Sequence, residues 1–232
     1  MEKHHDTDLA GRYDIYGPIH KGLRLGLARL LTRLGATDFA DPATVTALLG
    51  DLRAHLALGR AHLTHEEEHI HRALDTRAAG ACARLEEQHG HHKLRFAELD
   101  GLIRVVEASA MAERAAAGHD LYLAFSAFVA EDLAHMHEEE TATRAQLCAA
   151  FTDAELQGIE FGIISSLTPD ENIAYMRLML PAMTPVERLG LLSGMKAGAP
   201  AEAFAAVIEL AAKPTLPAND FANLAAGLGI AA

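Results

Sequence analysis

The chain has 232 residues, half of them apolar and only 5% aromatic, with no Trp, and this composition favours helices over strands. The 32 acidic residues outnumber the 20 Lys and Arg residues, which gives a net charge of −12 at pH 7. Because a chain of this charge repels a phosphate backbone, we do not expect nucleic acid as a partner.

The first two predicted helices are separated by a break at residues 35–41. The first helix covers about 15–34 and carries a stripe of leucines and isoleucines. Asp41 supplies an N-cap and Pro42 a first helical residue for a second helix, which reaches about residue 74. The apolar stripe of this second helix consists of Leu49, Leu52, Leu56, Leu63 and Ile70.

Two further long helices are predicted in the middle of the chain. The third follows residues 78–80 and carries apolar residues from Leu85 to Val106. Its pattern fades in an Ala-rich stretch, and the fourth helix covers about 120–151. Four long helices joined by short loops predict an all-α fold, an up-down-up-down four-helix bundle over residues 1–151.

Shorter helices are predicted for residues 152–232, which we interpret as a separate C-terminal helical extension. Three T-x-x-E capping boxes open helices there. They begin at Thr152, Thr168 and Thr184. Pro200 and Pro217 open two more helices, so the extension is expected to form a smaller bundle. Its amphipathic helices offer a surface through which two copies of the chain can form a homodimer.

Histidine stands out, with 14 residues, most of them inside the predicted long helices. Residues three or four positions apart share one face of a helix, so their orientation can be compared with the apolar stripes. The polar residues that fall on or beside the inward faces are His20, His62, Glu66, His89, His92, His135 and Glu139. His55, His69 and Asp132 lie on the same faces, where they either orient ligands or replace them.

Each long helix therefore turns at least one histidine inward, and two helices add a glutamate four residues later. Imidazole nitrogen and carboxylate oxygen together suit iron, manganese or zinc. Carboxylates can bridge two ions, and the interior of a helical bundle is a known location for such pairs. The pattern predicts a pair of metal ions inside the bundle.

Across about residues 10–150 this pattern resembles the hemerythrin-like family, also called HHE cation-binding domains. The family has a His on the first helix, H-x-x-x-E on the second, a His pair on the third, and His followed by Asp or Glu on the fourth. The resemblance implies two iron ions as the cofactor, with Glu66 and Glu139 as bridging ligands. It also implies that five histidines complete the coordination, namely His20, His62, His89, His92 and His135.

The chain departs from the oxygen-carrying members of that family at two positions. Lys93 stands four residues after His89, where those proteins have a second His, so His92 must serve instead. Glu140 stands five residues after His135, where they have Asp. We predict Glu139 as the ligand because it shares the face of His135, with Glu140 as the alternative.

The resemblance implies binding or sensing of a small molecule such as dioxygen, nitric oxide or peroxide. No nucleophile, phosphate loop or organic-cofactor motif is evident, which favours a binding protein over a dedicated enzyme. Two alternatives stay open: a di-iron enzyme that removes peroxide as a catalase does, and an iron-handling or stress-response protein. Zinc or manganese remains an alternative to iron.

The expected location is the cytoplasm. Cys82 and Cys148 stand singly, without the spacing of a disulfide framework or a cysteine zinc site. The first residues contain no apolar leader, and no run of 18 apolar residues occurs. We therefore expect an unexported protein without a membrane partner.

Overall fold

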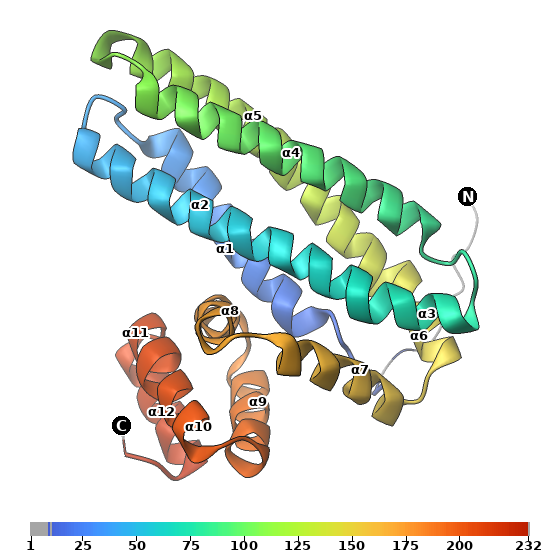
Figure 1. Ribbon diagram of the computed structural model, residues 1–232. Helices are drawn as coiled ribbons and strands as arrows, with labels where there is room; N and C mark the ends of the chain where they lie inside the picture. Colours follow the sequence, from blue (N-terminus) through green and yellow to red (C-terminus); the bar gives the residue numbers. More distant parts are fainter. Residues whose placement is uncertain (1–8, 10, 232) are drawn as a thin grey trace. The chain divides into compact units, whose positions relative to one another are not determined.

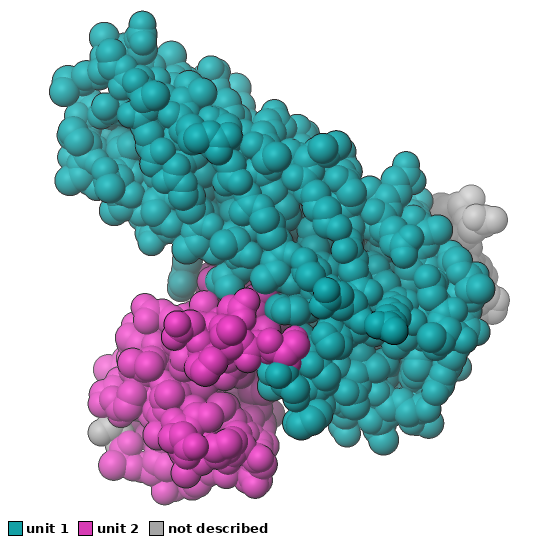
Figure 2. Space-filling view, in the orientation of Figure 1, with its two compact units in different colours: residues 1–17, 29–165 teal, residues 18–28, 166–232 magenta. Residues whose placement is uncertain are grey.

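Residues 9 and 11–231 are described by a computed structural model, and their secondary structure is all helical, with no strand (Figure 1). The chain divides into two units (Figure 2). Unit 1 comprises 1–17 and 29–165, and unit 2 comprises 18–28 and 166–232. Helix α1 (Gly17–Ala36) therefore contributes residues to both units. From the sequence we predicted a single domain boundary between residues 151 and 152. The two units of the structure differ from this, because 152–165 belong to unit 1 and 18–28 to unit 2.

Long helices form most of unit 1, and α4 and α5 lie side by side (Figure 1). Besides part of α1, unit 1 contains α2 (Pro42–His65), η1 (Glu66–His71), α3 (Arg72–Arg77), α4 (Ala83–Ala108), α5 (Met111–Glu138), η2 (Glu139–Thr143), α6 (Arg144–Ala150) and α7 (Asp153–Ser166). The last residue of α7, Ser166, is grouped with unit 2. The segments η1 and η2 are π-helical turns within longer α-helices: η1 lies between α2 and α3, and η2 lies between α5 and α6. Each of these turns begins at a glutamate, Glu66 or Glu139.

The helix boundaries follow the predicted signals with two differences. Asp41 caps α2 through its side chain, which accepts a hydrogen bond from the backbone N–H of Ala43, and Pro42 is the first helical residue, as predicted. The second helix continues three residues beyond the predicted end at 74, to Arg77. The fourth begins at Met111, nine residues before the predicted start at 120, because its Ala-rich first turns have high helix propensity.

Leucine-rich faces form the core of unit 1. The five residues of the predicted α2 stripe, from Leu49 to Ile70, are all buried. The aromatic residues Phe96, Phe125 and Phe128 of α4 and α5 are also buried and pack their rings against one another. This packing fixes the rotation of α4 and α5 about their axes, and with it the direction of their histidines.

Unit 2 is a cluster of short helices around its own apolar core. Its helical segments beyond α1 are α8 (Pro169–Ala182), α9 (Pro185–Gly198), α10 (Ala201–Val207), η3 (Ile208–Ala212), α11 (Lys213–Thr215) and α12 (Ala218–Leu228). The predicted capping boxes at Thr168 and Thr184 are confirmed, and Thr152 makes the same reciprocal bonds with Glu155 at the start of α7. Within unit 2, Gly22 lets α1 approach the backbone of α8, since a Cβ there would lie 3.0 Å from it.

None of the helices in the described part of the chain combines the length and apolar character that a membrane span requires.

His55 gives the fold a specific dependence on pH. It lies inside unit 1 on α2, and burial lowers its pKa from 6.5 to about 4. Between these two values the unfolded chain binds more protons than the folded one, so stability must fall as the pH falls through this window. Between pH 7 and pH 4 the free energy of unfolding of His55→Leu should fall by about 3 kcal/mol less than that of the wild-type protein.

Urea denaturation of the metal-free protein at several pH values measures this effect. His137→Leu is the matched control, because His137 is exposed on α5 and its replacement should leave the slope unchanged. A decline in His55→Leu as steep as in the unchanged protein would refute the prediction.

Candidate metal centre

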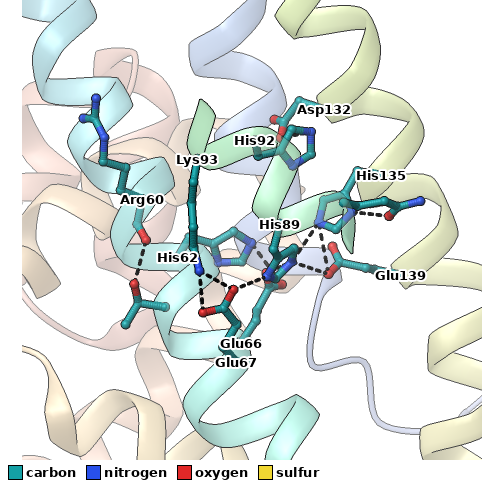
Figure 3. Close-up of polar contacts among 12 residues, drawn as sticks. Arg60, His62, Glu66, Glu67, His89, His92, Lys93, Asp132, His135 and Glu139 are labelled. Carbon is teal, nitrogen blue, oxygen red and sulfur yellow. Dashed lines mark hydrogen bonds and ion pairs between the residues drawn. The ribbon is translucent and has the colours of Figure 1, made fainter. Parts of the chain in front are cut away.

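Two histidines and two glutamates meet in the interior of unit 1 (Figure 3). Glu66 begins η1, His89 lies on α4, His135 lies near the end of α5, and Glu139 begins η2. All four side chains are buried, none more than 4% exposed. One ligand atom from each lies within 4.8 Å of the others. We call these four residues the His–Glu cluster.

The atoms at the centre of the cluster are the Nε2 atoms of its two histidines. They lie 3.1 Å apart. His135 Nε2 is 3.3 Å from Oε1 of Glu139, and His89 Nε2 is 3.6 Å from Oε2 of Glu66 and 3.8 Å from Oε1 of Glu139. Two imidazole nitrogens thus face each other and two carboxylates in a buried space.

Neighbouring side chains determine which nitrogen of each ring carries its proton. His89 Nδ1 lies 3.1 Å from Glu67 Oε1, and His135 Nδ1 lies 2.8 Å from Gln88 Oε1. An ionised carboxylate and an amide oxygen can only accept a hydrogen bond, so both Nδ1 atoms must donate one. In a neutral ring the Nε2 atom then carries a lone pair, which points into the cluster.

Lone pairs and carboxylates that face one another repel unless a cation lies between them. In the metal-free protein a proton on His135 can relieve this repulsion. Burial alone would lower the pKa of His135, but the nearby carboxylates of Glu139 and Glu66 raise it overall. Burial and the charge of Glu66 would raise the pKa of Glu139, yet the proximity of His135 and His89 lowers it. The same donor set, nitrogen and oxygen only, fits a divalent metal ion.

The two carboxylate oxygens of Glu66 lie near two different histidines. Its Oε1 lies 3.1 Å from Nε2 of His62, while its Oε2 faces His89. His62 is one turn before Glu66 on α2 and is largely buried. One carboxylate oxygen is therefore turned toward His89 of the cluster and the other toward His62.

Three predicted ligands lie outside the four-residue cluster: His62, which contacts Glu66, and His92 and His20. His92 is buried, with its ring 4.8 Å from that of His135, edge-on, and its Nε2 4.0 Å from Oδ1 of Asp132. Burial lowers its pKa to about 4, and the neighbouring His135 adds to this effect. His20 is buried on α1, in the stretch 18–28 that groups with unit 2. For all three residues the role of ligand stays a prediction from the sequence.

The alternatives that the sequence left open differ clearly in position. Glu139 is fully buried inside the cluster, whereas Glu140 is partly exposed and outside it. His69 points toward α7, where its Nδ1 lies 3.2 Å from the place that a Cβ on Gly162 would occupy. His69 is thus a packing residue between η1 and α7, and His55 lies among the core residues of α2.

Three functional contributions were not predicted from the sequence. Glu67 is partly buried and accepts a hydrogen bond from His89. Lys93, the residue at the missing histidine position, holds Glu67 through Nζ at 2.7 and 2.8 Å from its two oxygens. Gln88 bridges Glu138 and His135. Each of these residues contacts a side chain on another helix. The spacing of residues along one helix therefore could not have identified them.

A pocket of about 490 Å³ opens beside the cluster. It lies between α4 and α5, and Gln88, His92 and His135 form part of its lining. His135 belongs to both the pocket and the cluster, so a small molecule that enters the pocket reaches a candidate ligand directly.

The fold and site define an all-helical protein whose buried His–Glu cluster can hold a metal ion. No known protein family and no curated protein matches the chain. Any more specific function must therefore be argued from the residues of the site.

Gln88→Leu tests whether the outer hydrogen bonds orient the ligands. Without the amide oxygen, His135 is no longer held with Nε2 toward the cluster, and we expect the Kd for Zn²⁺ to rise about 10- to 100-fold. Competition with a chromophoric chelator measures the Kd. Gln157→Leu, on the exposed face of α7, is the control, and an equal Kd in the two variants would contradict the prediction.

Proposed function

We propose that unit 1 is a hemerythrin-like di-iron domain that binds or senses a small ligand: dioxygen, nitric oxide or peroxide. The observation that supports it best is the convergence of His89, His135, Glu66 and Glu139 on one buried point. Imidazole and carboxylate together are ligands that suit iron. The up-down-up-down four-helix bundle, with His20 as a further ligand, belongs to the same proposal.

The position of Glu66 supports a pair of ions over a single ion. Its two oxygens are turned to two different histidines, His62 and His89. Glu139, the first residue of η2, offers a second buried carboxylate. When bound, two iron ions would supply an open coordination position and the electrons that a small oxidant accepts.

The surrounding residues suit ligand binding without exposure to bulk water. Glu67 and Gln88 hold the rings of His89 and His135, and burial of the cluster excludes solvent from their Nε2 atoms. The pocket next to His135 admits a molecule of a few atoms to the edge of the cluster.

A second candidate function is the decomposition of peroxide, which needs groups that move protons. The pocket contains two such groups, His91 and His92, beside His135. Binding and turnover therefore have to be separated by experiment.

The test uses the full chain, loaded with Fe²⁺ without oxygen and then exposed separately to oxygen, nitric oxide or peroxide. The proposal predicts a visible absorption band that appears with oxygen and disappears when oxygen is removed. Sustained oxygen evolution from peroxide would instead support the enzyme. A protein that binds iron but shows no spectral change with oxygen, nitric oxide or peroxide would overturn the proposal.

A further inference from the structure

Another buried histidine lies next to the cluster, at the end of η1. His71 is 2% exposed, and neither of its ring nitrogens has a hydrogen-bond partner among the described residues. Burial of a polar group without a hydrogen bond costs free energy, so such groups are rare and call for a specific explanation. The ring of His71 packs against that of His89, with centroids 4.8 Å apart.

The π-helical turn explains why His71 faces the cluster. In an α-helix a residue five positions after Glu66 points about 140° away from it. In a π-helical turn the i→i+5 bond adds one residue to the turn and returns that residue to the same side. Glu66 and His71 are the first and last residues of η1, and both are buried, whereas Glu68 between them is exposed.

The electrostatics of His71 agree with this placement. Burial lowers its pKa, and the neighbouring His89 lowers it further, while the charges of Glu66 and Glu139 oppose the shift. The ring is thus within range of both carboxylates of the cluster. His71 is not one of the four residues whose ligand atoms lie within 4.8 Å of one another, but its ring is in contact with the ring of one of them, His89.

We propose that His71 is a further metal ligand, supplied by the last residue of η1. This inference rests on the proposed function, because it requires that the cluster binds metal. In a neutral ring one nitrogen carries the proton and the other a lone pair, so a metal ion would give that lone pair its missing partner. The π-helical turn would then add a further ligand to His62 and Glu66, which lie on the same helix.

Cobalt is a suitable probe, because each histidine bound to Co²⁺ gives an exchangeable, strongly shifted N–H resonance in the proton NMR spectrum. Compared with the unchanged protein, His71→Ala should lose one such resonance and bind Co²⁺ at least about tenfold more weakly. Added imidazole should enter the vacated space and restore the affinity. His55→Ala removes another buried imidazole, on α2, and should lose no resonance.

His71→Gln guards against a loss caused by misfolding, since it retains size and polarity but lacks the imidazole nitrogens. In the absence of metal, the Tm of His71→Gln should equal that of the wild-type protein. With Co²⁺, the variant should lose the same resonance as His71→Ala. An unchanged set of resonances and an unchanged Kd in both His71 variants would overturn the inference. Failure of the unchanged protein to bind Co²⁺ would instead overturn the proposed function.

Discussion

Glu139→Ala should nearly abolish metal binding, whereas Glu140→Ala should leave it intact. Glu139 is fully buried and its Oε1 lies 3.3 Å from His135 Nε2 and 3.8 Å from His89 Nε2. Its removal deletes one of two buried negative charges that balance a divalent ion. Loss of one partner of a buried ionic contact costs about 3–5 kcal/mol, which corresponds to a Kd raised about 10²- to 10³-fold or more.

Glu140 is the matched control because it is the adjacent glutamate on the same turn but is partly exposed. Anaerobic titration with Fe²⁺, or competition for Zn²⁺, measures both variants, and circular dichroism checks that both are folded. If Glu140→Ala lost the metal and Glu139→Ala kept it, Glu140 would be the ligand and our account of η2 would be wrong.

Metal should also stabilise the fold strongly. Without metal, two carboxylates and two imidazoles face one another in the buried cluster, and a divalent ion would relieve the repulsion between them. At a free metal concentration of about 1,000 times the Kd, the stabilisation is about 4 kcal/mol. For a chain of this size that raises the Tm by about 8–16 °C.

This stabilisation should depend on pH in a defined direction. The pKa of His135 is raised, so protons compete with metal for its Nε2 at pH values already above the ordinary 6.5. In the metal-free protein the protonated His135 stabilises the fold below pH 6.5, and that contribution is lost as the pH rises through its raised pKa. The proton therefore stabilises the fold at low pH and the metal ion at high pH. The difference between the Tm with metal and the Tm without metal should shrink as the pH falls.

Calorimetric melting with metal or with a chelator, between pH 8 and pH 5, measures the effect. The melting of Glu139→Ala should respond to metal much less than that of the wild-type protein at every pH, because its Kd is raised. Equal melting of the unchanged protein with metal and with the chelator at pH 8 would contradict a metal site in the core.

Much of unit 1 could be predicted from periodicity and capping. The leucine stripe of α2 and the cap at Asp41 are local features. They allow the start of this helix and its buried face to be predicted without knowledge of tertiary contacts. His135 and Glu139 share a face for the same reason, because residues four apart on a helix always do.

The features that could not be predicted depend on tertiary packing or on the π-helical turns. The run from Glu66 to His71 has no residue that marks a π-turn, and α-helical geometry places His71 on the wrong face. The roles of Gln88 and Lys93 depend on which residues of other helices lie opposite them, which spacing along one helix does not reveal.

The metal content of the protein purified from cells without added metal tests the central claim most directly. We predict two iron ions per chain, and less than one in Glu66→Ala, because Glu66 is the carboxylate turned toward both His62 and His89. Less than one metal ion per chain, with that content unchanged in Glu66→Ala, would contradict a metal site at the His–Glu cluster.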